Sequence, residues 1–178
     1  MTESALSILL VSVLKAGLLA RGVSATVQRD NQPRQQGAPS TAVVLFHHIS
    51  TVNVGWPEKA EVWNATNGNF DHTETQRRES RYQIDAIAPQ TPGDPTLPTT
   101  ADFVNAAAAV MQSDATILTL INSSVGVQHI TDIRSTYFVD DKGQTEENPS
   151  FDVIWSHEDI FTTSTPKINS FVASITGE

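Results

Sequence analysis

Three short stretches of the sequence contain residue types that could form a catalytic or metal-binding site. His157-Glu158-Asp159 follows an alternating segment, Phe151 to Ser156, that is typical of a buried strand. His72-Thr73-Glu74 matches the H-x-E half of a zinc deaminase signature. His47 and His48 form the third stretch.

Each stretch also has a simpler structural interpretation. The deaminase signature needs a P-C-x-x-C half, and the chain contains no cysteine. Consecutive strand residues point to opposite faces, so His47 and His48 cannot bind one metal together, and we expect one buried and one solvated ring. By the same rule His157 and Asp159 share a face if their strand continues, whereas Glu158 does not. At the end of a strand, these three residues would form a polar rim or a subunit contact.

Motifs of known catalytic sites are absent from the sequence. It contains no H-E-x-x-H, G-x-S-x-G, P-loop or G-x-G-x-x-G motif. Asp140-Asp141-Lys142-Gly143 lacks the spacing of a calcium loop and is typical of a turn. We therefore predict no enzyme activity and no catalytic, cofactor-binding or metal-binding residue. A small hydrolase or ligand-binding domain with a cleft around His157, built from residues distant in sequence, stays open as an alternative. Three tryptophans are predicted to be anchors for packing or for an interface: Trp56, Trp63 and Trp155.

The length and the charge of the chain limit the kinds of protein it can be. A chain of 178 residues suits one domain, which we place at residues 1–178. Its 11 Lys and Arg stand against 20 Asp and Glu, a net charge of −9. Binding of nucleic acid through phosphates needs clustered basic residues, so this chain should not hold DNA tightly.

The N-terminal segment is predicted to be a helix with one apolar face. Thr2 or Ser4 can cap its start, and Gly22 can end it. Glu3 is the only charged side chain before Lys15, whereas a signal peptide would begin with basic residues, and the run is too short for a membrane span. The helix should therefore pack on a sheet or on another subunit. Ile8, Val11 and Leu19 widen the apolar stripe of the helix. Its buried face is made by residues with helical spacing: Leu6, Leu9, Leu10, Val13, Leu14, Gly17 and Leu18.

Two long strands joined by a polar arm are predicted to follow. Residues 43–46 are apolar on both faces, which is typical of a central strand covered on both sides. A strand resumes over residues 77–89, and Asn67-Gly68 between the two is a strong turn signal. The polar arm, around residues 51–75, has little core of its own, so we expect it to contact partners outside the domain.

The remaining elements are shorter. A strand over 23–27 and a Pro-containing loop over 31–40 precede the central strand, and a rigid connector over 90–98 follows the arm. Thr99 and Asp102 predict a capping box for a middle helix. Four residues of that helix share a face: Phe103, Ala107, Val110 and Met111.

The last part of the chain is predicted to contain a hairpin. Residues 114–128 are compatible with either a helix or a strand, and Gly126 ends the segment in both cases. Residues 128–140 alternate as a strand, and the turn at 140–143 returns the chain to pair with the strand that begins near residue 148.

A resemblance to a known family is most specific over residues 130–160. This stretch contains "DIR", "YFVDDKG" and "PSFDVIWSHED", and it follows "QRDNQPR" and "RRESRYQIDAIAP" in order. The chain resembles the neck and tail-terminator, or collar, proteins of tailed bacteriophages. The resemblance implies an α+β fold: a mixed or antiparallel sheet with an N-terminal and a middle helix packed on it, plus an extended β-hairpin arm.

The resemblance also implies a function. A homo-oligomeric ring, expected to be a hexamer, would sit at the head–tail neck of the virion, terminate the tail tube and join it to the head connector. Its partners would be tail tube and possibly sheath proteins and head–tail connector proteins. DNA would pass through the lumen without specific binding, no membrane would be involved, and assembly would occur in the host cytoplasm. A connector or gateway ring, and a component of a bacterial contractile injection system, are alternatives that the sequence does not separate.

Overall fold

The computed structural model describes residues 1–30, 40–89, 96–139 and 145–167. The predicted loop over 31–40, the connector over 90–98, the turn at 140–143 and the C-terminal segment fall wholly or partly outside these ranges. The elements in chain order are α1 (Glu3–Ala20), β1 (Thr26–Arg29), β2 (Val43–Asn53), β3 (Glu58–Asn64), β4 (Asn69–Ile87), α2 (Thr100–Met111), α3 (Asp114–Asn122), β5 (Val125–Ile130), β6 (Arg134–Val139) and β7 (Thr145–Pro166).

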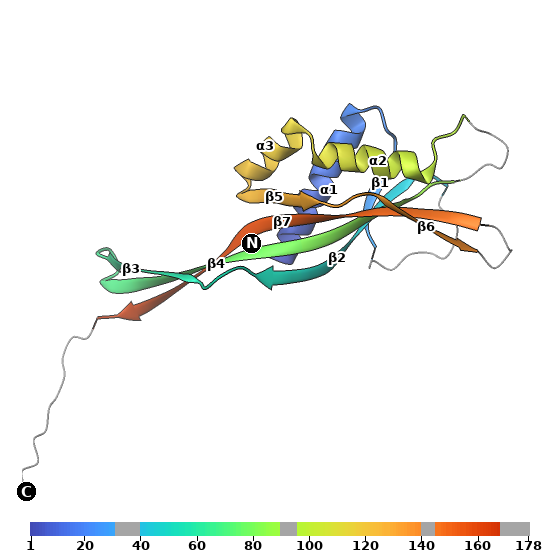
Figure 1. Ribbon diagram of the computed structural model, residues 1–178. Coiled ribbons are helices and arrows are strands. Elements are labelled where there is room, and N and C mark those ends of the chain that lie inside the picture. Colours follow the sequence, from blue (N-terminus) through green and yellow to red (C-terminus); the bar gives the residue numbers. More distant parts are fainter. Residues whose placement is uncertain (31–39, 90–95, 140–144, 168–178) are drawn as a thin grey trace, which may run out of the picture.

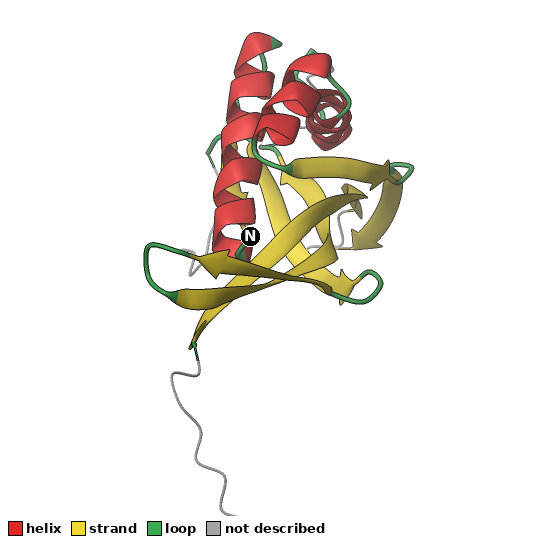
Figure 2. Ribbon diagram, turned by 90° about the vertical axis from the view of Figure 1, so that its left-hand side faces the viewer, coloured by secondary structure: helices red, strands yellow, loops and turns green. Residues whose placement is uncertain are grey.

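The strands form one mixed sheet. Its central order is β1-β2-β4-β7-β5, with β3 paired to β4 and β6 paired to β7. β1 pairs in parallel with β2, and the other pairings are antiparallel. The helices gather on one side of the sheet (Figures 1 and 2). This arrangement confirms the predicted α+β fold with an N-terminal and a middle helix on a sheet.

α1 begins and ends where the sequence indicates. Thr2 caps it by accepting a hydrogen bond from the Ala5 amide at 3.2 Å, and Gly22 follows its end with a φ of +71°. Ile8 and Leu19, which widen its apolar stripe, are 69% and 78% exposed, so the described part of this chain does not cover them. α1 is also long and apolar enough to cross a membrane by length and composition, contrary to our expectation, yet in this structure its leucine face is buried in the core.

α2 has the predicted start and the predicted buried face. The Asp102 amide donates to Thr99 Oγ1 at 3.3 Å, and the Thr99 amide donates to Asp102 Oδ2 at 2.8 Å, which completes the capping box. Gly17 of α1 lies directly against Val110 of α2: a Cβ added to Gly17 would be 2.2 Å from Val110 Cγ1. The glycine therefore allows the two helices to approach closely.

The core lies between these helices and the central strands. Tyr82 is at the centre of a row of aromatic side chains that crosses β2, β4 and β7. Its ring centroid is 6.4 Å from that of Phe46 and 5.9 Å from that of Trp155, and none of the three is more than 1% exposed. The alternation of Phe151, Val153 and Trp155, each fully buried, continues this row along β7. The central strand predicted over residues 43–46 is buried on both faces, as expected.

Several predicted boundaries are wrong. Residues 114–128 form helix α3 and then β5, and the break falls at Ser123 and Ser124, which has a φ of +58°. Gly126 lies inside β5, so it does not end the helix or the strand. Residues 128–140 are divided between β5 and β6, although β6 pairs with β7 as the predicted hairpin requires.

The strand boundaries around the arm also differ from the prediction. β4 begins at Asn69, well before residue 77, directly after the Asn67-Gly68 turn, where Gly68 has a φ of +64°. β7 does not end at His157-Glu158-Asp159 but continues to Pro166 in antiparallel pairing with β4. The three residues therefore lie within a strand, and the prediction that they form its polar rim is wrong.

Candidate assembly surface on the extended arm

His157 lies inside the sheet and belongs to a chain of polar side chains. Its Nε2 is 3.0 Å from Ser80 Oγ, which is 2.9 Å from Thr51 Oγ1, and that hydroxyl is 2.8 Å from His48 Nε2. This series of hydrogen-bonded side chains crosses β7, β4 and β2. It starts at His157, two residues after Trp155 of the buried aromatic row. Burial lowers the pKa of the His157 imidazole below its usual value of 6.5, so the neutral ring is the favoured form.

Ser80 and His157 are as close together as a catalytic nucleophile and its base, but neither side chain is accessible to a substrate. Ser80 is 1% exposed and His157 is 4% exposed, so a substrate carbonyl cannot reach the hydroxyl. Among the described residues, no side chain hydrogen-bonds to the buried His157 Nδ1, so no carboxylate there orients the ring as the third member of a triad would. The alternative, a hydrolase or ligand-binding site, would need an open cleft around His157. In the described part of the structure His157 is buried instead.

The two acidic neighbours of His157 separate as predicted. Asp159 lies on the same face and accepts from Arg78 Nη1 at 2.9 Å, while Glu158 is exposed on the other face. Among the described residues, no group of three or more His, Asp or Glu is placed to hold a metal ion.

The other histidine stretches are also dispersed. His47 and His48 are both partly buried, so the prediction of one buried and one solvated ring is wrong. His47 Nδ1 is 4.0 Å from Asp30 Oδ2, whereas His48 stacks edge-on against Tyr82. His72 lies on β4, where its Nδ1 is 3.1 Å from Glu61 of β3.

Two motifs that carry the family resemblance meet in the body of the sheet. Arg134, from "DIR", donates from Nη2 to Oδ1 of Asp152, from "PSFD", at 3.0 Å. Asp152 is only 7% exposed, and its amide donates to Thr131 Oγ1 at 2.8 Å. These motifs therefore fix the chain between β5 and β6 against β7.

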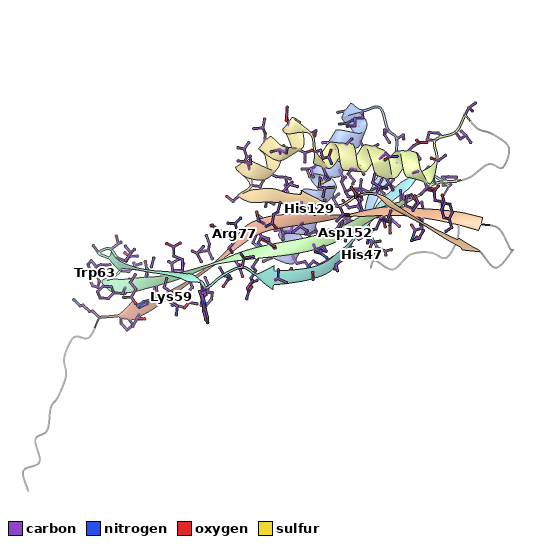
Figure 3. The ribbon with its side chains drawn as sticks, in the orientation of Figure 1. His47, Lys59, Trp63, Arg77, His129 and Asp152 are labelled. Atoms are coloured by element: carbon purple, nitrogen blue, oxygen red, sulfur yellow. The ribbon has the colours of Figure 1, made fainter. Side chains whose placement is uncertain are left out.

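The molecule extends beyond its core as a three-stranded arm. The arm consists of β3, residues 69–75 of β4 and residues 160–166 of β7, and in Figure 1 it projects away from the helices. Figure 3 shows Lys59 and Trp63 on this arm, far from His129 and Asp152 in the body. The predicted arm range, around 51–75, did not include the β7 residues.

Side chains on the arm pair mainly with one another. Asp71 joins all three strands, because it accepts from Asn64 of β3 at 2.9 Å and from Ser164 of β7 at 2.7 Å. The hydrogen bond from Ser164, followed by that from Asn64, holds the pKa of Asp71 below its usual value. The Trp63 and Phe70 rings meet edge to face at 4.9 Å.

Large apolar side chains are nevertheless left exposed along the arm. Ile160 and Phe161 of β7 are 61% and 65% exposed, and Val62 of β3 is 63% exposed. Trp56, in the turn before β3, is 95% exposed, whereas Trp155 is fully buried, so the tryptophans divide between surface and core. Ile160 and Phe161 were not among the predicted interface residues; the threonine-rich run that follows them is the signal in the sequence that the strand continues.

An arm with this exposed apolar surface is suited to association with another protein surface. Exposed apolar residues gathered on one part of a surface mark interaction sites. The strand ladders and the hydrogen bonds of Asp71 join the three strands into one small sheet that presents these side chains.

Comparison with known proteins gives one family. A family model described as "E217 gateway protein gp29" matches residues 5–167, which includes the body and the arm. No curated protein matches the chain. A similar solved structure is the sheath/tube terminator of an extracellular contractile injection system, PVC, in its extended state, determined by cryo-EM. It has 13% sequence identity and a TM-score of 0.47, with 100% of this chain and 64% of that chain covered. The chain thus spans less than two thirds of that terminator's length.

Proposed function

The chain belongs to the family of the E217 gateway protein gp29, and from this premise we propose that it is a structural ring protein in the neck of a tailed phage. Copies of the chain would close into a ring between the head connector and the tail tube, joining the two. The observation that carries the proposal is the family match over residues 5–167. The predicted resemblance to phage neck and tail-terminator proteins is confirmed, and within that class the match is to a gateway protein, which was an alternative prediction.

Association through the arm supports this proposal. The arm exposes apolar side chains on two strands, and such a surface needs a protein partner to cover it. A closed ring of identical subunits uses two different surfaces of each subunit, one for each neighbour. The proposed partners are therefore further copies of the chain, expected to number six, together with connector, tail tube and possibly sheath proteins.

The negative net charge of the chain is consistent with DNA passing through the ring without binding to it. The net charge of −9 repels phosphates, and weak contact is what a channel for moving DNA requires. We propose that acidic side chains line part of the lumen. Replacing lumen acids with lysine should slow DNA ejection, and unchanged ejection would count against this part of the proposal.

A structural role also accounts for the polar residues of the body. Thr51, Ser80 and His157 Nε2 are linked by hydrogen bonds where the body meets the arm. We propose that they stabilise the strand alignment there and perform no catalysis. The single domain over residues 1–178, assembly in the host cytoplasm and location in the virion neck are parts of the same proposal.

Assembly of particles without this chain tests the function. Cells that produce every other particle component should accumulate DNA-filled heads and unattached tails, and the purified protein should join them when added. Tails of uniform length in its absence would indicate a gateway ring, whereas overlong tube would indicate a terminator. Complete, infectious particles formed without the chain would overturn the proposal.

A further inference from the structure

The arm has two open strand edges of equal length. β3 pairs through one edge with residues 69–75 of β4, and residues 160–166 of β7 pair with the same β4 residues from the other side. On β7, the pairings to β5 and β6 extend no further than His157. In the described part of the chain, the outer edges of β3 and of residues 160–166 therefore have no ladder partner.

The two edges are only lightly protected against pairing: Pro166 closes the β7 segment, and Glu58 begins β3. Edge strands are normally blunted by charges, prolines or bulges. Residues 160–165 of β7, Ile-Phe-Thr-Thr-Ser-Thr, contain no charge and have a high strand propensity. On β3, two of the charges are engaged on its own sheet, since Lys59 lies 3.1 Å from Glu74 and Glu61 lies 3.1 Å from His72. Both edges are thus available for strand addition.

The direction of the strands determines how two copies can join. β3 and β7 are each antiparallel to β4, so they run in the same direction. Rotation about a ring axis parallel to the arms keeps every arm pointing the same way. The β7 edge of one subunit would then meet the β3 edge of the next in parallel, and each contact would cover one edge of each kind.

The outer edges of β3 and of residues 160–166 carry side chains that can pack against each other on one face of the arm. The register places Ala60 and Val62 on the same face of the arm as Ile160 and Thr162. Val62 and Ile160 are 63% and 61% exposed, and continuation of the sheet would set apolar and β-branched side chains side by side on this face.

We propose that residues 160–166 of one subunit add as a parallel strand to the outer edge of β3 of the next subunit. The arms would form one continuous sheet around the ring, and every subunit would contribute three strands to it. This inference rests on the proposed ring but adds to it the two surfaces that make the contact.

Engineered disulfides test the contact directly, because the chain has no cysteine of its own. Ala60 and Thr162 both flank Thr73, so within one subunit they are separated by a full strand, about 9–10 Å, which is too far for a disulfide. Between neighbours at the proposed junction they would be about 5 Å apart. Glu58→Cys and Val62→Cys, on the same face as Ala60→Cys, cover registers shifted by two residues.

Thr162→Cys is mixed with each single β3 variant, and the oligomer is oxidised. We expect mixed dimers for one of the three β3 variants, and a covalent ladder up to the full ring when the two cysteines are in one chain. The matched control pairs Thr162→Cys with Leu118→Cys, an exposed position on α3 that should not cross-link.

The outcomes separate this inference from the proposed function. Homodimers of Thr162→Cys alone would indicate antiparallel pairing of two β7 edges and would overturn the inference, as would cross-links to Leu118→Cys. A ring of normal mass without any β3–β7 cross-link would overturn the inference and leave the proposed function standing. A chain that never associates would overturn both.

Discussion

Ser80 Oγ and His157 Nε2 lie 3.0 Å apart across β4 and β7, at the point where the core of the body gives way to the arm. Both residues are almost fully buried, and the hydrogen bond continues through Thr51 to His48. The pair therefore lies between the buried core of the sheet and the part that projects from it.

Stability should depend on pH through His157. Burial holds its folded-state pKa below 6.5, so between that lowered pKa and 6.5 the unfolded chain binds more protons than the folded chain. The free energy of unfolding should be highest above pH 6.5 and should fall as the pH is lowered through this window. Chemical denaturation at a series of pH values measures it.

The matched variants isolate this histidine from the other four in the chain. His157→Gln, which keeps a partner for Ser80, should flatten the dependence below pH 6.5, and His129→Gln, at an exposed position, should leave it unchanged. An identical slope in wild type and His157→Gln would contradict the assignment.

Removing the guanidinium of Arg134 should destabilise the body. Asp152, which is 7% exposed in the wild type, would lose its charged partner, and a largely buried group left unpaired costs about 1–3 kcal/mol. Urea denaturation of Arg134→Ala measures this loss. The double variant Arg134→Ala/Asp152→Asn should recover part of it, because the amide carries no charge; strictly additive losses would show that the two side chains do not interact.

Gly17 should not tolerate a side chain. In Gly17→Ala the new Cβ would overlap Val110, and overpacking of this kind costs about 1–3 kcal/mol. Thermal unfolding should show a lowered midpoint. Val110→Ala removes the opposing methyl groups, so Gly17→Ala should be much less costly in that background, and an equal cost in both backgrounds would refute the close helix contact.

Two tryptophans should respond in opposite ways. Trp155→Ala removes a fully buried side chain from the aromatic row, and the expected loss of stability is about 3–5 kcal/mol. Trp56→Ala changes a residue that is 95% exposed, so the free energy of unfolding should stay within about 0.5 kcal/mol. Calorimetry of the two variants compares them; a large loss in Trp56→Ala would place that ring in the core.

Much of the body follows from local patterns. The leucine spacing of α1, the capping box at Thr99 and the alternation in Phe151–Trp155 are signals that a few adjacent residues carry, and each is present in the structure. Gly68 likewise has the positive φ that a tight turn needs.

The errors arise where distant pairing decides the outcome. His157-Glu158-Asp159 read as the end of a strand because it is polar, but β4 supplies a ladder partner for every residue as far as Pro166. Ile8 and Leu19 extend the apolar stripe of α1, but apolar character alone does not tell what covers them, and in the described part of the chain both are exposed. The hydrogen bonds that join Thr51, Ser80 and His157 form only when β2, β4 and β7 pair in the correct register. The sequence of one segment alone does not predict that register.

The arm shows the same limit. Its turn and its polarity could be predicted, whereas the contribution of β7, nearly a hundred residues further along the chain, could not. The open edges that we propose as the subunit contact become visible only when both flanking strands are placed on β4.

The mass of the assembled protein is the most direct test of the account. Native mass spectrometry or light scattering of the purified chain, alone and with tail tubes, should give a closed oligomer near six subunits, or a monomer that becomes one on the tube. A chain that remains a monomer at every concentration, with and without tubes, would contradict the neck-ring function.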